Sequence, residues 1–162
     1  MRVSLTTRVT RRGDLAAHLT RVEAALRGNG PMGVKAGLPQ GKAPADLIRI
    51  GGYQHFGTAG GASGGGWGGP VPSRPFITVA LFKGSRSIRA EMRRAARAAF
   101  RGVPLSASLP RLGERAETLI RAQVQAGLAP ANAPATVRLK GFDQPLTHTG
   151  RLAAGITWTF DR

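Results

Sequence analysis

The chain has 162 residues, of which 41% are hydrophobic and 6% aromatic. This is enough apolar material for one modest core, so a single domain over residues 1–162 is expected. Twenty-four Lys and Arg residues against eight Asp and Glu give a formal net charge of +16. The sequence has no cysteine, which excludes a disulfide framework and a thiolate metal site and is typical of a cytoplasmic protein.

Neither a membrane span nor an export signal is expected. No run of about 18 apolar residues occurs, as a transmembrane helix would require. The opening stretch MRVSLTTRVTRRGDL has charges where a signal peptide needs an apolar core. These features predict a soluble protein that has no membrane contact and does not use the usual secretory route.

The basic residues are mostly arginine. Only four of the 24 are lysine, which leaves 24 − 4 = 20 arginines. A surface rich in guanidinium groups favours phosphate or carboxylate partners, because the planar fork stays charged and binds such anions in a bidentate way. A coding bias toward Arg, Ala and Gly also explains the choice of Arg over Lys, although it does not explain the shortage of acids. Both interpretations stay open.

The N-terminal third contains two predicted helices and a predicted strand. Residues 14–27 space their apolar side chains by 4, 3 and 4 positions, which predicts an amphipathic helix that ends at Gly28. Residues 32–39 alternate apolar and polar side chains and predict a short strand. Residues 45–56 have a looser helical spacing, weakened by two adjacent glycines. The apolar stripe of the first helix consists of Leu15, Leu19, Val22 and Leu26.

A glycine tract occupies residues 57–69, with eight glycines in thirteen positions. It lacks the Lys-Ser/Thr ending of a phosphate-binding loop, so we expect a flexible loop. Trp67 stands out in this tract, because a large aromatic ring left in water forfeits its burial energy. We expect Trp67 either to fold back on the domain or to dock on a neighbouring subunit. Three prolines between residues 70 and 75 should then hold the chain extended.

Residues 85–101 predict the clearest helix. Its apolar positions Ile88, Met92, Ala95 and Ala99 fall within about 60° of one another on a helical projection. Four arginines fall within about 80° on the opposite side, with Glu91 as the only acid of the helix. Such a stripe is either an ordinary solvated face or a contact with an anionic partner. The stripe consists of Arg86, Arg93, Arg97 and Arg101.

The C-terminal third predicts two helices and a final turn-helix-strand unit. A helix over 109–126 should turn Leu112, Ala116 and Leu119 inward. On the same helix Glu117 should pair with Arg121. A short helix over 135–140 should then end at Gly141. Asp143 and Pro145 then form a turn, and Thr147 or Thr149 is expected to cap a short helix that ends at Gly155. Ile156, Trp158 and Phe160 alternate with threonines, which predicts a strand with one apolar and one hydroxyl face. The expected fold is α+β, a small antiparallel sheet flanked by several helices.

Four segments resemble one protein family in order. TVRLKGFDQPLTHTGRLAAGITW resembles the C-terminal signature of the tail-completion and head-tail joining family of tailed bacteriophages, in which a KG-x-D-x-PL-x-x-TG-x-L-x-x-x-I pattern recurs. Upstream, VKAGL, YQHFGT and VPSRPF resemble further segments of that family, so the likeness covers about residues 32 to 160. The departures are His55, where a Glu is common, and a longer glycine tract. The C-terminal positions that carry the resemblance, with the neighbouring tryptophan, are Gly141, Asp143, Pro145, Leu146, Thr149, Gly150, Leu152, Ile156 and Trp158.

The resemblance implies a structural virion protein of the phage neck, assembled in the host cytoplasm. Such a protein completes the tail or joins it to the head, as one subunit of a homo-oligomeric ring around the DNA channel, and a tail terminator is the nearest alternative. The implied partners are other neck and tail proteins and genomic duplex DNA in the channel. No catalytic role and no cofactor or metal are expected: His18, His55 and His148 are scattered, and no metal-ligand or paired-carboxylate spacing occurs.

A nucleic-acid-binding protein is the alternative from another class. The net charge and the arginine stripe favour it, whereas the sequence has no zinc-finger spacing and no aromatic RNA-binding motif. Such a protein should retain duplex DNA as an isolated monomer with a steep salt dependence. A neck protein should instead form rings, or bind a partner ring, and show little specific DNA affinity.

Overall fold

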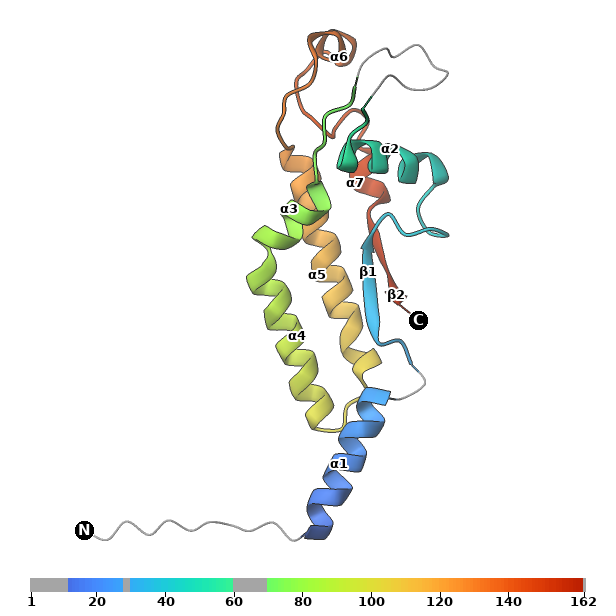
Figure 1. Ribbon diagram of the computed structural model, residues 1–162, viewed down its shortest axis with the longest axis vertical. Helices are drawn as coiled ribbons and strands as arrows, with labels where there is room; N and C mark the ends of the chain where they lie inside the picture. Colours follow the sequence, from blue (N-terminus) through green and yellow to red (C-terminus); the bar gives the residue numbers. More distant parts are fainter. Residues whose placement is uncertain (1–11, 28–29, 60–69, 162) are drawn as a thin grey trace, which may run out of the picture.

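Helices dominate the structure, a computed structural model that describes residues 12–27, 30–59 and 70–161 (Figure 1). Within these ranges the fold is α+β, as predicted, with helices around one small antiparallel sheet. In chain order the elements are α1 (Arg12–Arg27), β1 (Gly33–Gly37), α2 (Ala45–Phe56), α3 (Phe76–Lys83), α4 (Ser85–Phe100), α5 (Leu105–Ala126), α6 (Pro134–Lys140), α7 (Arg151–Gly155) and β2 (Thr157–Asp161).

The long helix α5 is the centre of the fold. It packs against α3, against α4 and against both strands of the sheet, and in Figure 1 it lies between α4 and β1. Its buried side chains Ile120 and Val124 join Phe76 of α3 and Ile156, which precedes β2, in a core where none of the four is exposed to solvent. Burial of large apolar side chains of this kind is the main stabilising term in a fold. The helix begins four residues earlier than the predicted 109–126.

The sheet has two strands, paired antiparallel so that Ala36 lies opposite Trp158 and Lys35 opposite Thr159. One face turns toward α5, where the Trp158 ring packs on Gly113 so closely that a Cβ at that glycine would overlap it. Successive side chains of a strand point to opposite faces, so Lys35 and Thr159 lie on the face away from α5. The predicted division into an apolar and a hydroxyl face is therefore confirmed, although Phe160 keeps 38% of its surface exposed rather than lying in the core.

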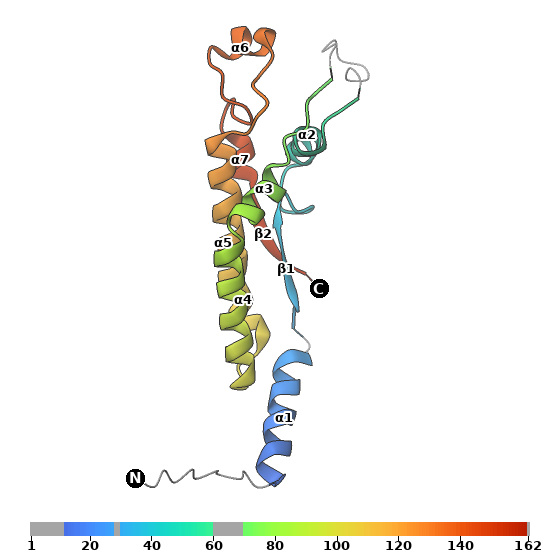
Figure 2. The ribbon, with the colours of Figure 1, turned by 60° about the vertical axis from the view of Figure 1, so that its left-hand side comes forward.

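Two of the predicted apolar stripes are only partly buried. Ala95 and Ala99 of α4 are buried as expected, but Met92 is 54% exposed. In α1, Val22 is buried, whereas Leu15 and Leu19 are more than half exposed, which corrects the expectation of a fully packed stripe. The reason is visible in Figure 2, where α1 projects beyond the end of the α4–α5 pair and only its C-terminal part lies near α4.

Helix α3 has no counterpart among the predicted elements. Its sequence FITVALFK is apolar nearly throughout, so it has neither the helical period nor a strand alternation that periodicity could detect. It continues almost directly into α4 through Gly84, and a Cβ at Gly84 would overlap the side chain of Leu119 on α5. The small glycine therefore lets the α3–α4 junction approach α5 without displacing the Leu119 side chain.

The C-terminal turns follow the prediction with one exception. Gly141 ends α6 in a left-handed conformation (φ 78°) and donates its N–H to the carbonyl of Val137, and Glu117 pairs with Arg121 at 3.0 Å. Neither Thr147 nor Thr149 caps α7, which corrects that expectation. The capping residue is Gly150, with φ 75° and no side-chain bond, because the left-handed backbone required there favours glycine over threonine.

The glycine tract lies mostly outside the described residues. The structure does not describe positions 60–69, which include Trp67, so the expectations for the loop and for its tryptophan stay predictions. The two flanks of the tract are described and lie side by side: the Thr58 amide donates to the carbonyl of Val71, and the Val71 amide donates to the Thr58 hydroxyl, at 2.9 and 3.0 Å.

Candidate functional site

The arginine face of α4 is exposed along its whole length. We use this name for Arg86, Arg93, Arg97 and Arg101, which the structure places on the side of α4 away from its buried alanines, as predicted. Within the described part of the chain, none of these four guanidinium groups forms a hydrogen bond or an ion pair. A cationic surface without internal partners is available to an external anion.

A hollow lies along the C-terminal part of this face. It has a volume of about 500 Å³, and it is lined by Arg93, Arg94, Arg97 and Arg101 together with Ala90 and Ala98. The two alanines follow from the helical spacing, since positions 90, 97 and 101 fall on one side of a helix and 94 and 98 lie beside them. Their small side chains leave room between the long arginines, so an anion could approach the helix backbone.

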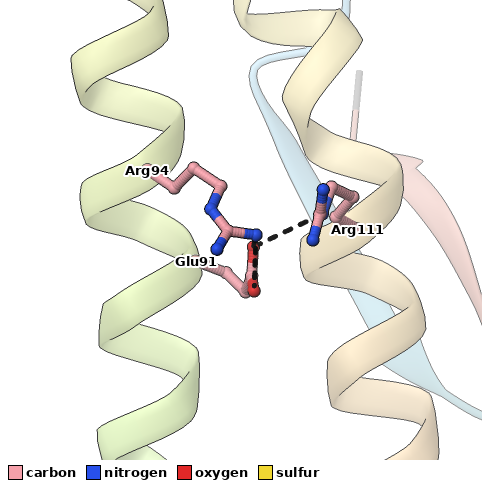
Figure 3. A network of polar contacts seen from close by, with 3 residues as sticks. All are labelled: Glu91, Arg94 and Arg111. Carbon is pink, nitrogen blue, oxygen red and sulfur yellow. Dashed lines mark hydrogen bonds and ion pairs between the residues drawn. The ribbon is translucent and has the colours of Figure 1, made fainter.

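One arginine of the hollow is already paired. Both carboxylate oxygens of Glu91 lie 3.5 Å from Nη1 of Arg94, and one lies 3.7 Å from Nε of Arg111 on α5 (Figure 3). The two arginine side chains are more than half exposed, so these contacts contribute little to stability. The contacts with Glu91 hold Arg94 at the edge of the hollow. Because Glu91 is used in this way, no acid of α4 opposes the positive charge of Arg93, Arg97 and Arg101.

A different arginine, Arg74, is buried and was not predicted as important. Only 4% of its surface is exposed. Its Nε donates to the carbonyl of Pro130 at 2.8 Å, and its terminal nitrogens donate to Gln54 Oε1 and to the carbonyl of Ala131, each at 3.0 Å. We call these four residues the Arg74 cluster. Burial lowers the pKa of Arg74, and the charge of the nearby Asp143 opposes that shift.

Asp143 serves the fold rather than a reaction. One of its carboxylate oxygens accepts bonds from the backbone amide and the side-chain amide of Asn132, both at 3.0 Å. This carboxylate therefore fastens the loop before α6 to the turn after it. His148, which the sequence places in the same turn region, is exposed.

His55 has an unusual environment at the end of α2. Its ring packs edge-on against Phe56 and Phe76, with ring centres 4.7 and 5.3 Å apart. Nε2 lies 3.5 Å from the Thr78 hydroxyl, while the buried Nδ1 has no hydrogen-bond partner among the described residues. Burial lowers the pKa of His55, because the charged ring would lose hydration that these neighbours do not replace.

The residues of the C-terminal signature mostly build the fold. Leu152 and Ile156 are buried in the core, and Leu146 packs against it in a left-handed conformation (φ 65°). Gly141 and Gly150 supply two more left-handed positions. Pro145, Thr149 and Trp158 complete the set: Pro145 lies near Gly127, Thr149 is exposed, and Trp158 packs on α5. These residue types are thus explained by backbone geometry and packing.

The described residues contain neither a membrane-spanning helix nor a cluster of metal ligands. No helix there is both long enough and apolar enough to cross a membrane. In the same part of the chain, no three His, Cys, Asp or Glu side chains gather as metal ligands would. Comparison with known proteins gave no match either, whether to a family model, to a curated protein or to a solved structure.

The Arg74 cluster was the part of the molecule that sequence reasoning missed. Periodicity cannot find it, because Arg74 lies between two prolines in a segment without regular structure and its partners are up to 57 residues away. The signal that could have indicated this cluster is the VPSRPF segment, in which one charged residue, Arg74, lies between two prolines and directly before Pro75-Phe76.

Proposed function

We propose that this chain is a non-enzymatic structural protein of the phage neck, which completes the tail or joins it to the head as one subunit of a ring around the DNA channel. The proposal rests on one observation: the segments that resemble the tail-completion and head-tail joining family bind one another. The Ser73 hydroxyl donates to the carbonyl of His55 at 2.8 Å, and the Arg74 amide donates to that of Gln54 at 2.7 Å.

The other resembling segments meet in the same way. The strand VKAGL pairs with the strand that ends the C-terminal signature, so Lys35 lies opposite Thr159 across more than a hundred residues of sequence. Gly155, within the C-terminal signature, lies so near VKAGL that a Cβ built on it would be 3.5 Å from the Leu38 side chain. The four segments follow the order seen in the tail-completion and head-tail joining family, and they also contact one another in space. Both facts support the proposal that this fold is related to that family.

Assembly rather than chemistry is the role that the exposed surfaces favour. Five of the described acids are engaged in turns or ion pairs: Glu91, Glu117, Asp46 and Asp161 face arginine or lysine, and Asp143 binds Asn132. Glu114 is exposed on α5. General acid–base catalysis needs a positioned group close to a substrate site, and none of these pairs lies in an enclosed cavity. The large unpaired cationic surface is what an assembly protein would use to contact a neighbour.

The direct test is deletion of the gene from the phage or prophage that encodes it, with electron microscopy of the particles produced. We expect DNA-filled heads and separate tails, and full recovery when the gene is supplied in trans. Tails of abnormal length would instead favour the alternative role of tail terminator. Normal joined particles in the deletion would contradict any role in the virion.

A nucleic-acid-binding protein outside the virion is the second candidate, and the arginine face is the observation that favours it. The two functions differ in assembly state. Light scattering and negative-stain microscopy of the purified full chain should show rings, or rings formed on a partner ring, if it is a neck protein. A persistent monomer with tight, sequence-specific DNA binding would favour the second candidate.

A further inference from the structure

The arginine face has a chemistry that points to one kind of anion. We propose that it binds the sugar-phosphate backbone of duplex DNA without reading the base sequence. This inference names the partner of one surface of the proposed neck protein. It rests on the proposed function only in placing that partner in the DNA channel. The binding itself can be measured on the isolated protein.

The first argument is the state of the arginines. Arg93, Arg97 and Arg101 have no partner in the described residues, and the single acid of α4 is already shared between Arg94 and Arg111. A guanidinium group binds a phosphate through two parallel N–H donors, and such charge-assisted bonds are stronger than neutral ones. The face therefore presents several ready donors at no cost in broken internal bonds.

The second argument is the length of the face. Arg86 and Arg101 are fifteen positions apart, which corresponds to about 22 Å along a helix. Duplex DNA carries one negative charge for about every 1.7 Å of its axis, so about six base pairs would lie beside α4. In Figure 1 helix α5 lies on one side of α4 and no described element covers the other side, so a long, regular polyanion can lie along it.

The third argument separates DNA from an acidic protein surface. Protein interfaces depend on large apolar or aromatic anchors that fill pockets at their centre. The hollow in the arginine face is lined by arginine and alanine alone, and Ala90 and Ala98 are too small to act as anchors. Phe100, at the end of the same helix, is 61% exposed but does not line the hollow. Phosphate contacts position a protein on DNA without specifying a sequence, which agrees with a face built from one residue type.

The strength of binding should be modest for one subunit. Non-specific binding of duplex DNA has dissociation constants of about 10⁻⁴ to 10⁻⁶ M at physiological salt. Several subunits in a ring would contact the same duplex and raise the overall affinity by acting together. Weak, sequence-independent contact also suits a channel through which DNA must move, because each contact is released easily.

The experiment measures fluorescence anisotropy of two labelled 20-base-pair duplexes of unrelated sequence with the full chain, between 50 and 200 mM NaCl. Four phosphate contacts predict a slope of about −3.6 in log K against log salt, and therefore about a 100-fold loss of affinity over this range for both duplexes. The double variant Arg93→Glu/Arg97→Glu should lose at least two phosphate contacts, so its slope should fall to about half and its affinity by at least tenfold.

A matched control separates the face from the net charge. Arg49→Glu/Arg138→Glu makes the same change in charge at two exposed arginines of α2 and α6, neither with a partner among the described residues. The control should keep the slope of the parent protein. An equal loss in both double variants would overturn the proposal, because net charge alone would then explain binding. Strong preference for one duplex, or binding to labelled polyglutamate but not to DNA, would also overturn it.

The outcome stays separable from the proposed function. If the protein does not bind DNA but the deletion still yields separate heads and tails, the inference fails and the neck assignment stands. If DNA binding depends on the face but deletion yields normal particles, the neck assignment fails while the DNA-binding face stands.

Discussion

Arg74 and Arg97 carry the same side chain in opposite environments. Arg74 is buried, and its guanidinium group donates to three oxygens of the protein from two other segments. Arg97 is exposed on α4, with no partner in the part of the chain that is described. The arginines of this chain therefore have two separate uses. The Arg74 cluster joins three segments of the fold, whereas the arginine face forms no hydrogen bond or ion pair within the described residues.

The largest expected effect is that of Arg74→Ala. It should lower the free energy of unfolding by about 3 to 5 kcal/mol, because the carbonyls of Pro130 and Ala131 and the amide oxygen of Gln54 lose their charged donor inside the protein. Denaturation in urea measures the change. In the same assay Arg97→Ala should change stability by no more than about 0.5 kcal/mol. Similar values for the two variants would remove the distinction between them.

A second test concerns the contact between α5 and the sheet. Gly113→Ala should destabilise the protein by about 1 to 3 kcal/mol, because the new Cβ overlaps the Trp158 ring. Gly52→Ala is the matched control, since it also lies in a helix and no atom lies within 4 Å of its added Cβ. That control should be neutral or stabilising by up to about 1 kcal/mol. A Gly113→Ala variant as stable as the parent would mean that Trp158 does not pack there.

His55 provides a smaller, pH-dependent effect. Its pKa in the folded protein lies below the ordinary value of 6.5, so the unfolded chain binds a proton more readily. Stability should be complete above about pH 6.5 and fall as the pH drops through that value toward the folded pKa. Thermal melts between pH 7.5 and 5 would show this loss. His55→Asn should flatten the profile, whereas the exposed His148→Asn should leave it as in the parent.

The smallest expected effect on stability is that of the double variant Arg93→Glu/Arg97→Glu. Exposed charges without partners are largely screened by salt, so the melting temperature should stay within about a degree or two of the parent value. Differential scanning calorimetry at 150 mM salt measures it. A loss of several degrees would show that these side chains have a partner inside the folded subunit, and the comparison with Arg74 would then fail.

Much of the fold followed from the sequence because its signals are local. The helix at 85–101 has a clear period of 3.6, and the two strands alternate over a few residues, so their positions were predicted well. The helix α3 was not, because an apolar segment without alternation has no period to detect. The Arg74 cluster was missed because it depends on contacts between residues far apart in the sequence.

The candidate site divides in the same way. The helical projection places Arg93 and Arg97 on one exposed face, and the structure confirms that placement. The hollow between them was not predicted, since it depends on how the arginine side chains spread around Ala90 and Ala98. Leu15 and Met92 lie on predicted apolar stripes but are more than half exposed, because periodicity gives the side of a helix that is apolar but not how much of that side a partner covers.

The most direct measurement is the titre of the encoding phage when the deleted gene is replaced by Arg93→Glu/Arg97→Glu, with Arg49→Glu/Arg138→Glu as the control of equal charge. A stable, folded subunit that fails only in assembly is what an exposed cationic face with an external anionic partner requires. We predict that the face variant reduces the titre at least tenfold while its melting temperature stays near the parent value, and that the control supports a normal titre. A normal titre for the face variant at ordinary salt would contradict any role for these arginines, and the charge of +16 would then reflect composition alone.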